Sequence, residues 1–167
     1  HPPKPETHLT FGVLLNLATV CQAEDKAVLW GYISRYVPAA TPATAPILDR
    51  LVGYAIAYYR DFVRPTNRHR PPSEMEKTAF ADLIATLEKL PKDATPEAIQ
   101  FEVYEVGKRH PFADLRAWFQ SIYEVLLGQS QGPRMGSFIA VYGIPETVAL
   151  IKRGIAGDLV KAEPANT

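Results

Sequence analysis

The chain has 167 residues, and its 18 lysines and arginines are balanced by 18 aspartates and glutamates. A net charge of zero excludes a general field that draws the protein to nucleic acid or membrane, so RNA binding would need a local basic patch. No stretch approaches the roughly 20 apolar residues of a membrane span. The single cysteine, Cys21, excludes an intrachain disulfide and favours a reducing compartment such as the cytoplasm.

The spacing of apolar residues predicts helices along most of the chain. We expect them at residues 10–22, 24–37, 48–63, 73–90, 95–108, 115–127 and 145–159. Ser73 with Glu76 forms a capping box, and Thr95 precedes a proline suited to the first helical turn. No segment alternates as a strand does, so we predict an all-α bundle of about seven or eight helices.

A chain of this length predicts one domain. Residues 10–160 carry the helical pattern and are assigned to that domain. Residues 1–9 are polar and proline-rich, which is typical of a linker or of the edge of a piece of a longer protein. Residues 161–167 are polar and are expected to form a flexible tail.

A glycine-rich stretch, residues 127–136, separates two helical regions, and a short apolar segment follows it. Gly128, Gly132 and Gly136 are spaced four apart, but a proline and polar residues between them exclude a membrane helix-pairing motif. Because glycine permits positive φ and close backbone approach, we predict a tight, ordered loop that presents Arg134. Gly128 occupies the position of a helix-ending glycine.

No catalytic or metal-binding signature is evident. The histidines are scattered and lack partners at ligand spacing, and no nucleotide-binding glycine loop of the Walker or Rossmann form occurs. Basic residues gather in a few places: Arg64, Arg68 and Arg70; Lys108 and Arg109; Arg134; Lys152 and Arg153. Such residues also complement helix C-termini, so residue pattern alone leaves both an RNA-binding face and an ordinary surface open.

The run from Phe119 to Phe138, FQSIYEVLLGQSQGPRMGSF, resembles the C-terminal region of class I lysyl-tRNA synthetases. Three further segments agree in the same order: FGVLL from Phe11, AYYRDFVRP from Ala57 and FEVYEVG from Phe101. The resemblance covers about residues 10–155. The end of glutamyl-tRNA synthetases is more weakly similar, because here the GPRMG motif is intact.

The resemblance implies the anticodon-binding domain of a lysine–tRNA ligase, with an all-helical bundle or cage fold and with tRNA(Lys) as its partner. The family's nucleotide-binding signatures are absent from this chain. We therefore expect a C-terminal fragment that binds tRNA, is not catalytic alone and holds no metal or cofactor. ATP with magnesium would be bound by a Rossmann catalytic domain of the same polypeptide. We expect a cytoplasmic protein with no membrane partner.

Single-stranded RNA is bound through stacking, base-edge hydrogen bonds and cation–phosphate contacts. The candidate RNA-binding residues are Arg134, Gln131, Gln129, Ser137, Arg68, Arg70, Lys108 and Arg109. Three alternatives remain: a loop shaped only for packing two helices, a helical protein-interaction domain related to synthetases, or the anticodon domain of a glutamyl-type synthetase.

Overall fold

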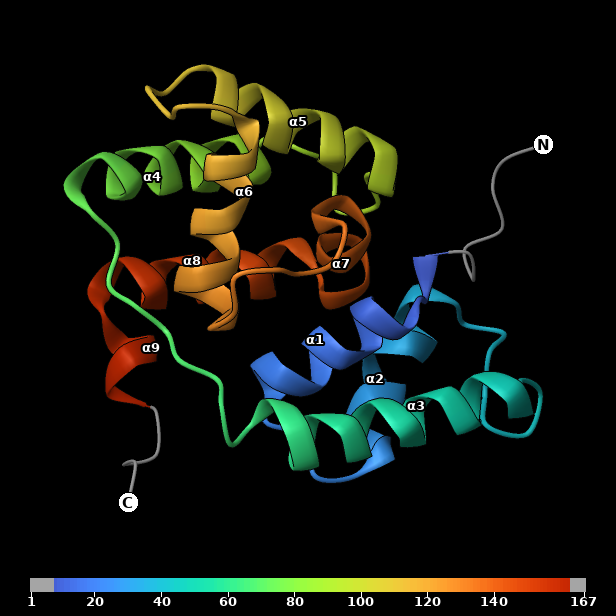
Figure 1. Ribbon diagram of the computed structural model, residues 1–167. Coiled ribbons are helices and arrows are strands. Elements are labelled where there is room, and N and C mark those ends of the chain that lie inside the picture. The colour runs from blue at the N-terminus through green and yellow to red at the C-terminus, as the bar shows by residue number, and fades with distance from the viewer. Residues whose placement is uncertain (1–7, 163–167) are drawn as a thin grey trace.

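The computed structural model describes residues 8–162 (Figure 1). Within them are nine α-helices and no strand, which confirms the predicted all-α class and adds to the expected number of helices. The helices are α1 Phe11–Cys21, α2 Lys26–Tyr36, α3 Pro46–Tyr58, α4 Glu74–Glu88, α5 Pro96–Lys108, α6 Leu115–Ile122, α7 Met135–Tyr142, α8 Ile144–Ala156 and α9 Asp158–Lys161. Most of the predicted linker and tail, residues 1–7 and 163–167, lie outside the described residues.

Two of the predicted helices end in π-helical turns. Tyr59–Val63 continues α3 and Tyr123–Leu127 continues α6, so each pair matches one predicted helix. Local π-helical turns inside helices frequently occur at functional sites. Here the two turns lead into the 64–70 segment and into the glycine loop, two connections that carry the candidate residues Arg68, Arg70 and Arg134.

Short-range capping fixes several helix starts where the sequence places them. The Thr10 hydroxyl accepts a hydrogen bond from the Val13 N–H at 3.2 Å. Both bonds of the capping box are present: the Glu76 N–H donates to the Ser73 hydroxyl at 3.2 Å, and the Ser73 N–H donates to the Glu76 carboxylate at 2.8 Å. Thr95 caps α5 in the same way. These bonds satisfy N–H groups that the first turn of a helix leaves open.

The helices form two groups with α7 and α8 between them (Figure 1). Helices α4, α5 and α6 lie on one side and α1, α2 and α3 on the other. Helix α7 packs against α5, α1 and α2, and α8 packs against α4 and the π turn at residues 123–127. The glycine loop leads directly into α7, so its backbone is anchored to the centre of the fold.

Helix α7 is the element that the sequence analysis left as a short apolar segment. Met135, Phe138, Ile139 and Val141 are all buried, as are its small residues near the N-terminus. A helix that is apolar on all sides belongs inside the protein. The packed structure also reaches further toward the N-terminus than predicted, because His8 and Leu9 of the predicted linker are buried.

No helix within residues 8–162 is long and apolar enough to cross a membrane.

Candidate functional site

The glycine loop is held against its surroundings at several points. Gly128 has φ +72° and ends the π turn, and a Cβ there would lie 2.7 Å from the Asn67 carboxamide nitrogen. A Cβ on Gly132 would lie 2.4 Å from the Tyr123 ring. The Tyr123 hydroxyl donates to the Pro133 carbonyl at 2.9 Å. These contacts confirm the predicted tight loop with close backbone approach.

Arg134 sits at the end of this loop, as the residue that precedes the first turn of α7. Its side chain is exposed and forms no hydrogen bond or ion pair with any residue of the described range 8–162. Gln131 is exposed beside it on the loop. A cation on a fixed backbone, with no internal carboxylate to neutralise it, suits contact with an anionic ligand.

The other two loop candidates are less accessible. The Gln129 amide nitrogen is enclosed and has no hydrogen-bond partner among residues 8–162. Ser137 is 4% exposed, and its hydroxyl lies 2.8 Å from the His8 ring nitrogen. The base-edge contact predicted for Ser137 does not fit this position, because the hydroxyl is inside the protein and already bonded to the segment before α1.

A row of aromatic rings leads from α5 to the glycine loop. Phe101 and Tyr104 are 59% and 38% exposed on α5. The Tyr104 and Phe119 ring centroids are 5.1 Å apart, and Phe119 lies 6.4 Å from Tyr123, the tyrosine that bonds the loop. Exposed aromatic side chains are the usual platforms for stacking unpaired bases. Phe119, between the other two rings, is half-buried.

Arg70 is committed to internal carboxylates. Its guanidinium donates to the Glu76 carboxylate at 2.8 and 2.7 Å and to Glu124 at 2.7 Å. The bonds from Arg70 hold the pKa of Glu76 below its ordinary value, against the effect of burial. Arg70 therefore ties the 64–70 segment to α4 and to the π turn after α6. Arg68, two residues earlier, is exposed, and within residues 8–162 its guanidinium bonds only the Asn67 carbonyl.

We expect Arg70→Ala to lower the free energy of unfolding by about 2–3 kcal/mol, because it leaves the nearly buried Glu76 carboxylate without its cation. Denaturant titration measures the loss. The matched control is Arg68→Ala, which removes an exposed side chain and should change stability by less than about 0.5 kcal/mol. Equal midpoints for the two variants would contradict the bracing role of Arg70.

Lys108 and Arg109 also face carboxylates. Arg109 donates to both oxygens of Asp82, at 3.1 and 3.0 Å, and the His110 ring nitrogen lies 2.8 Å from the same group. Lys108 pairs with Glu105 at 3.2 Å on the surface of α5. The hydrogen bonds from Arg109, helped by His110, lower the pKa of Asp82 to about 2. This cluster joins α4 to the end of α5.

The lowered pKa of Asp82 predicts how the stability of the fold depends on pH. A carboxyl whose pKa falls from 3.8 to about 2 on folding stabilises the protein above pH 3.8, and that stability is lost as the pH falls toward 2. The stability difference between wild type and Asp82→Asn should therefore shrink over this interval, as followed by thermal unfolding. Asp93→Asn, at an exposed position in the turn after α4, should show no such trend. A constant Asp82→Asn difference would contradict the pairing.

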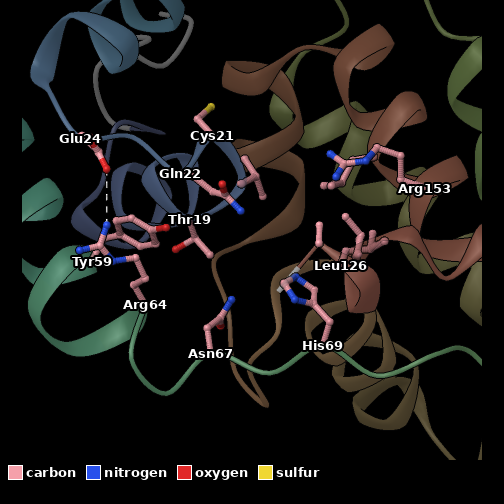
Figure 2. Close-up of a pocket in the computed structure, with 14 residues that line it drawn as sticks. Thr19, Cys21, Gln22, Glu24, Tyr59, Arg64, Asn67, His69, Leu126 and Arg153 are labelled. Carbon is pink, nitrogen blue, oxygen red and sulfur yellow. Dashed lines mark ion pairs between the residues drawn. The ribbon is translucent and has the colours of Figure 1, made fainter. Parts of the chain in front are cut away.

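A cleft that the sequence did not predict lies between the end of α1, the 64–69 segment and α8–α9 (Figure 2). Its volume is about 580 Å³. The polar side chains that line it include Gln22, Arg64, Asn67, His69 and Arg153. The sequence analysis noted the two arginines in separate basic clusters, but only the fold brings them to one cavity.

The described residues thus form an all-helical domain in which a glycine loop, held by Tyr123, presents an exposed arginine that none of them neutralises. It is similar to curated proteins named lysine–tRNA ligase. That of Rickettsia felis is 45% identical over 151 residues, which is 90% of this chain and 29% of the relative. That of Rickettsia bellii is 46% identical over 151 residues, again 90% of this chain and 29% of the relative. That of Roseobacter denitrificans is 46% identical over 158 residues, 95% of this chain and 30% of the relative.

The chain therefore spans less than a third of the length of these relatives. The similarity confirms the lysyl-tRNA synthetase part of the resemblance seen at residues 119–138. Neither a family model nor a solved structure matches the chain.

Proposed function

We propose that this chain is the part of a class I lysine–tRNA ligase that binds the anticodon arm of tRNA(Lys). The observation that carries the proposal is the glycine loop, where Arg134 is exposed and unneutralised by any described residue, in a chain similar over 90% of its length to lysine–tRNA ligases. The GPRMG motif that presents Arg134 is the most specific element of the sequence resemblance.

The surface around this loop suits an unpaired RNA loop. Arg134 offers a planar guanidinium for bidentate contact with a base edge or phosphate. Phe101 and Tyr104 offer exposed rings for stacking. Gln131 offers a carboxamide for a base edge. The candidates Arg70, Lys108 and Arg109 have internal carboxylate partners, so in this proposal they support the surface and Arg134 makes the main contact.

In the whole ligase, lysine would be activated with ATP and magnesium and then joined to the tRNA by a Rossmann catalytic domain of the same polypeptide. This chain would contribute binding and orientation of the RNA. Residues 8–162 contain no group of three or more histidine, cysteine, aspartate or glutamate side chains placed to hold a metal ion. We expect no lysine-dependent ATP–pyrophosphate exchange from this chain by itself.

Binding of labelled tRNA(Lys) across a range of salt concentrations tests the proposal. The matched competitor is the same tRNA with its anticodon replaced. We expect tighter binding of the lysine anticodon and a logarithmic affinity that falls linearly with the logarithm of salt concentration. Equal affinity for the two RNAs would contradict anticodon recognition, and no binding to either at low salt would contradict RNA binding altogether.

A further inference from the structure

We propose that the cleft between α1, the 64–69 segment and α8–α9 holds a single unstacked nucleotide of the bound RNA. The proposal rests on the proposed function, because the same RNA must first engage the glycine loop. In this arrangement Arg153 contacts the phosphate, and Asn67 and Gln22 contact the base.

The cleft has the size and walls of a nucleotide pocket. Its volume of about 580 Å³ lies within the roughly 300–1,000 Å³ range of small-molecule sites. Three leucines provide an apolar wall for the face of a base: Leu126, Leu150 and Leu159. Figure 2 shows Gln22, Asn67 and His69 arranged around one space, with Arg153 extending toward it from α8.

The cleft also has positive charge that internal pairing leaves largely available. Arg153 forms no ion pair or side-chain hydrogen bond with any of residues 8–162. Arg64 pairs with Glu24 at 3.6 Å, and that carboxylate is 82% exposed. Exposed pairs of this kind are weak, so Arg64 still adds positive charge on the side of the cleft opposite Arg153.

Asn67 supplies the polar contact that the protein itself does not complete. Its carboxamide oxygen is enclosed and accepts no hydrogen bond from the described residues. Because the oxygen is enclosed, the carboxamide nitrogen, which bonds no described residue and points toward the cleft in Figure 2, is the group that can donate to an acceptor on a base. Gln22, which ends α1 with a left-handed backbone of φ 48°, also lines the cleft.

The cleft is continuous with the glycine loop through Asn67. The carboxamide of Asn67 packs on Gly128, and the N–H of Arg68 donates to the Gly128 carbonyl at 3.0 Å. The start of the loop at Gly128 therefore packs directly on the residues that form one wall of the cleft. An RNA strand that passes along the start of the loop can therefore place a nucleotide in the cleft.

Cys21 provides a probe of access to the cleft, since it belongs to the lining on the side away from Asn67 and His69 and is the one cysteine of the chain. Burial raises the pKa of its thiol, so its alkylation by a maleimide is measured at a fixed, mildly alkaline pH. We expect the anticodon stem-loop of tRNA(Lys) to slow this alkylation several-fold at saturating RNA. A free nucleoside monophosphate that protects Cys21 when the RNA does not would identify a small-molecule site and overturn the proposal.

A matched pair of charge variants gives the second readout. Arg153→Gln and Lys152→Gln remove one positive charge each from neighbouring exposed positions of α8, but only Arg153 lines the cleft. We expect Arg153→Gln to weaken RNA binding by about tenfold and to reduce the slope of its salt dependence by about one, as the loss of a phosphate contact does. Lys152→Gln should bind like wild type, and circular dichroism should show both variants fully helical.

The outcomes separate this proposal from the proposed function. If the RNA binds but leaves Cys21 alkylation unchanged, and Arg153→Gln behaves like Lys152→Gln, the cleft is not part of the RNA site and the anticodon-binding function stands. If wild-type protein binds neither tRNA(Lys) nor its stem-loop at low salt, both proposals are wrong.

Discussion

Arg134→Ala is expected to weaken tRNA(Lys) binding by roughly 1–3 kcal/mol, about 5- to 150-fold, the range for a good bidentate base contact. The side chain is exposed and bonds to no described residue, so its removal breaks no internal interaction and should leave the fold unchanged. The loss of affinity would therefore report the contact with RNA. Titration of labelled tRNA(Lys) measures it, with circular dichroism as the check on folding.

Two comparisons define what Arg134 contacts. Arg50→Ala, at an exposed position of α3 away from the loop, removes the same side chain and should leave affinity unchanged. Loss of a base contact by Arg134→Ala should reduce the preference for the lysine anticodon, whereas loss of a phosphate contact should weaken binding to all tRNAs and flatten the salt dependence. If Arg134→Ala binds as wild type does and Arg68→Ala loses affinity, the glycine loop is a packing turn.

Arg109→Ala does not serve as a comparison of this kind. Arg109 joins α5 to Asp82 of α4 through two hydrogen bonds, so its removal changes stability as well as surface charge.

The basic clusters were visible in the sequence, but their carboxylate partners were not. Arg70 and Glu124 are 54 positions apart, and Arg109 and Asp82 are 27 apart. Pairing at such separations depends on how the helices pack, which local residue patterns do not determine.

Features of the fold that depend on a few consecutive residues could be predicted. The capping box at Ser73 and the caps at Thr10 and Thr95 each involve residues three positions apart. The helix end at Gly128 follows from one residue's access to positive φ. In each case the bond that fixes the element is made within the element, so the sequence contains the necessary information.

Helix α7 and the environment of Ser137 could not be predicted in this way. An amphipathic pattern requires one polar face, and α7 has none because it is enclosed by α5, α1 and α2. Ser137 was predicted as a candidate RNA-binding residue because its hydroxyl can form a hydrogen bond with a base edge. Its partner, His8, is 129 positions away and belongs to a segment assigned to a linker. The cleft was missed for the same reason, since its walls come from four separate parts of the chain.

Gly136→Ala is expected to destabilise the protein by about 3 kcal/mol or more, at or above the upper end of the usual cost of overpacking. A Cβ at this position would lie 2.2 Å from the Pro96 carbonyl oxygen and 2.7 Å from the Gln100 Cβ. The closest neighbour is backbone of α5, which does not rotate away as a side chain can. The Gly136 N–H also donates to the Gln100 side chain at 2.6 Å, so moving α7 outward breaks an enclosed hydrogen bond.

Gly31→Ala, in the middle of α2, is the matched control for this substitution. No atom outside its own helix lies within 4 Å of a Cβ placed there, so the substitution causes no clash. Alanine has the higher helix propensity, so Gly31→Ala should stabilise the protein by about 0.5–1 kcal/mol. Denaturant titration should therefore move the two midpoints in opposite directions. Because α7 carries Arg134 at its start, Gly136→Ala should also weaken tRNA(Lys) binding where the protein is still folded. A Gly136→Ala midpoint equal to that of wild type would show that α5 and α7 are not packed backbone to backbone.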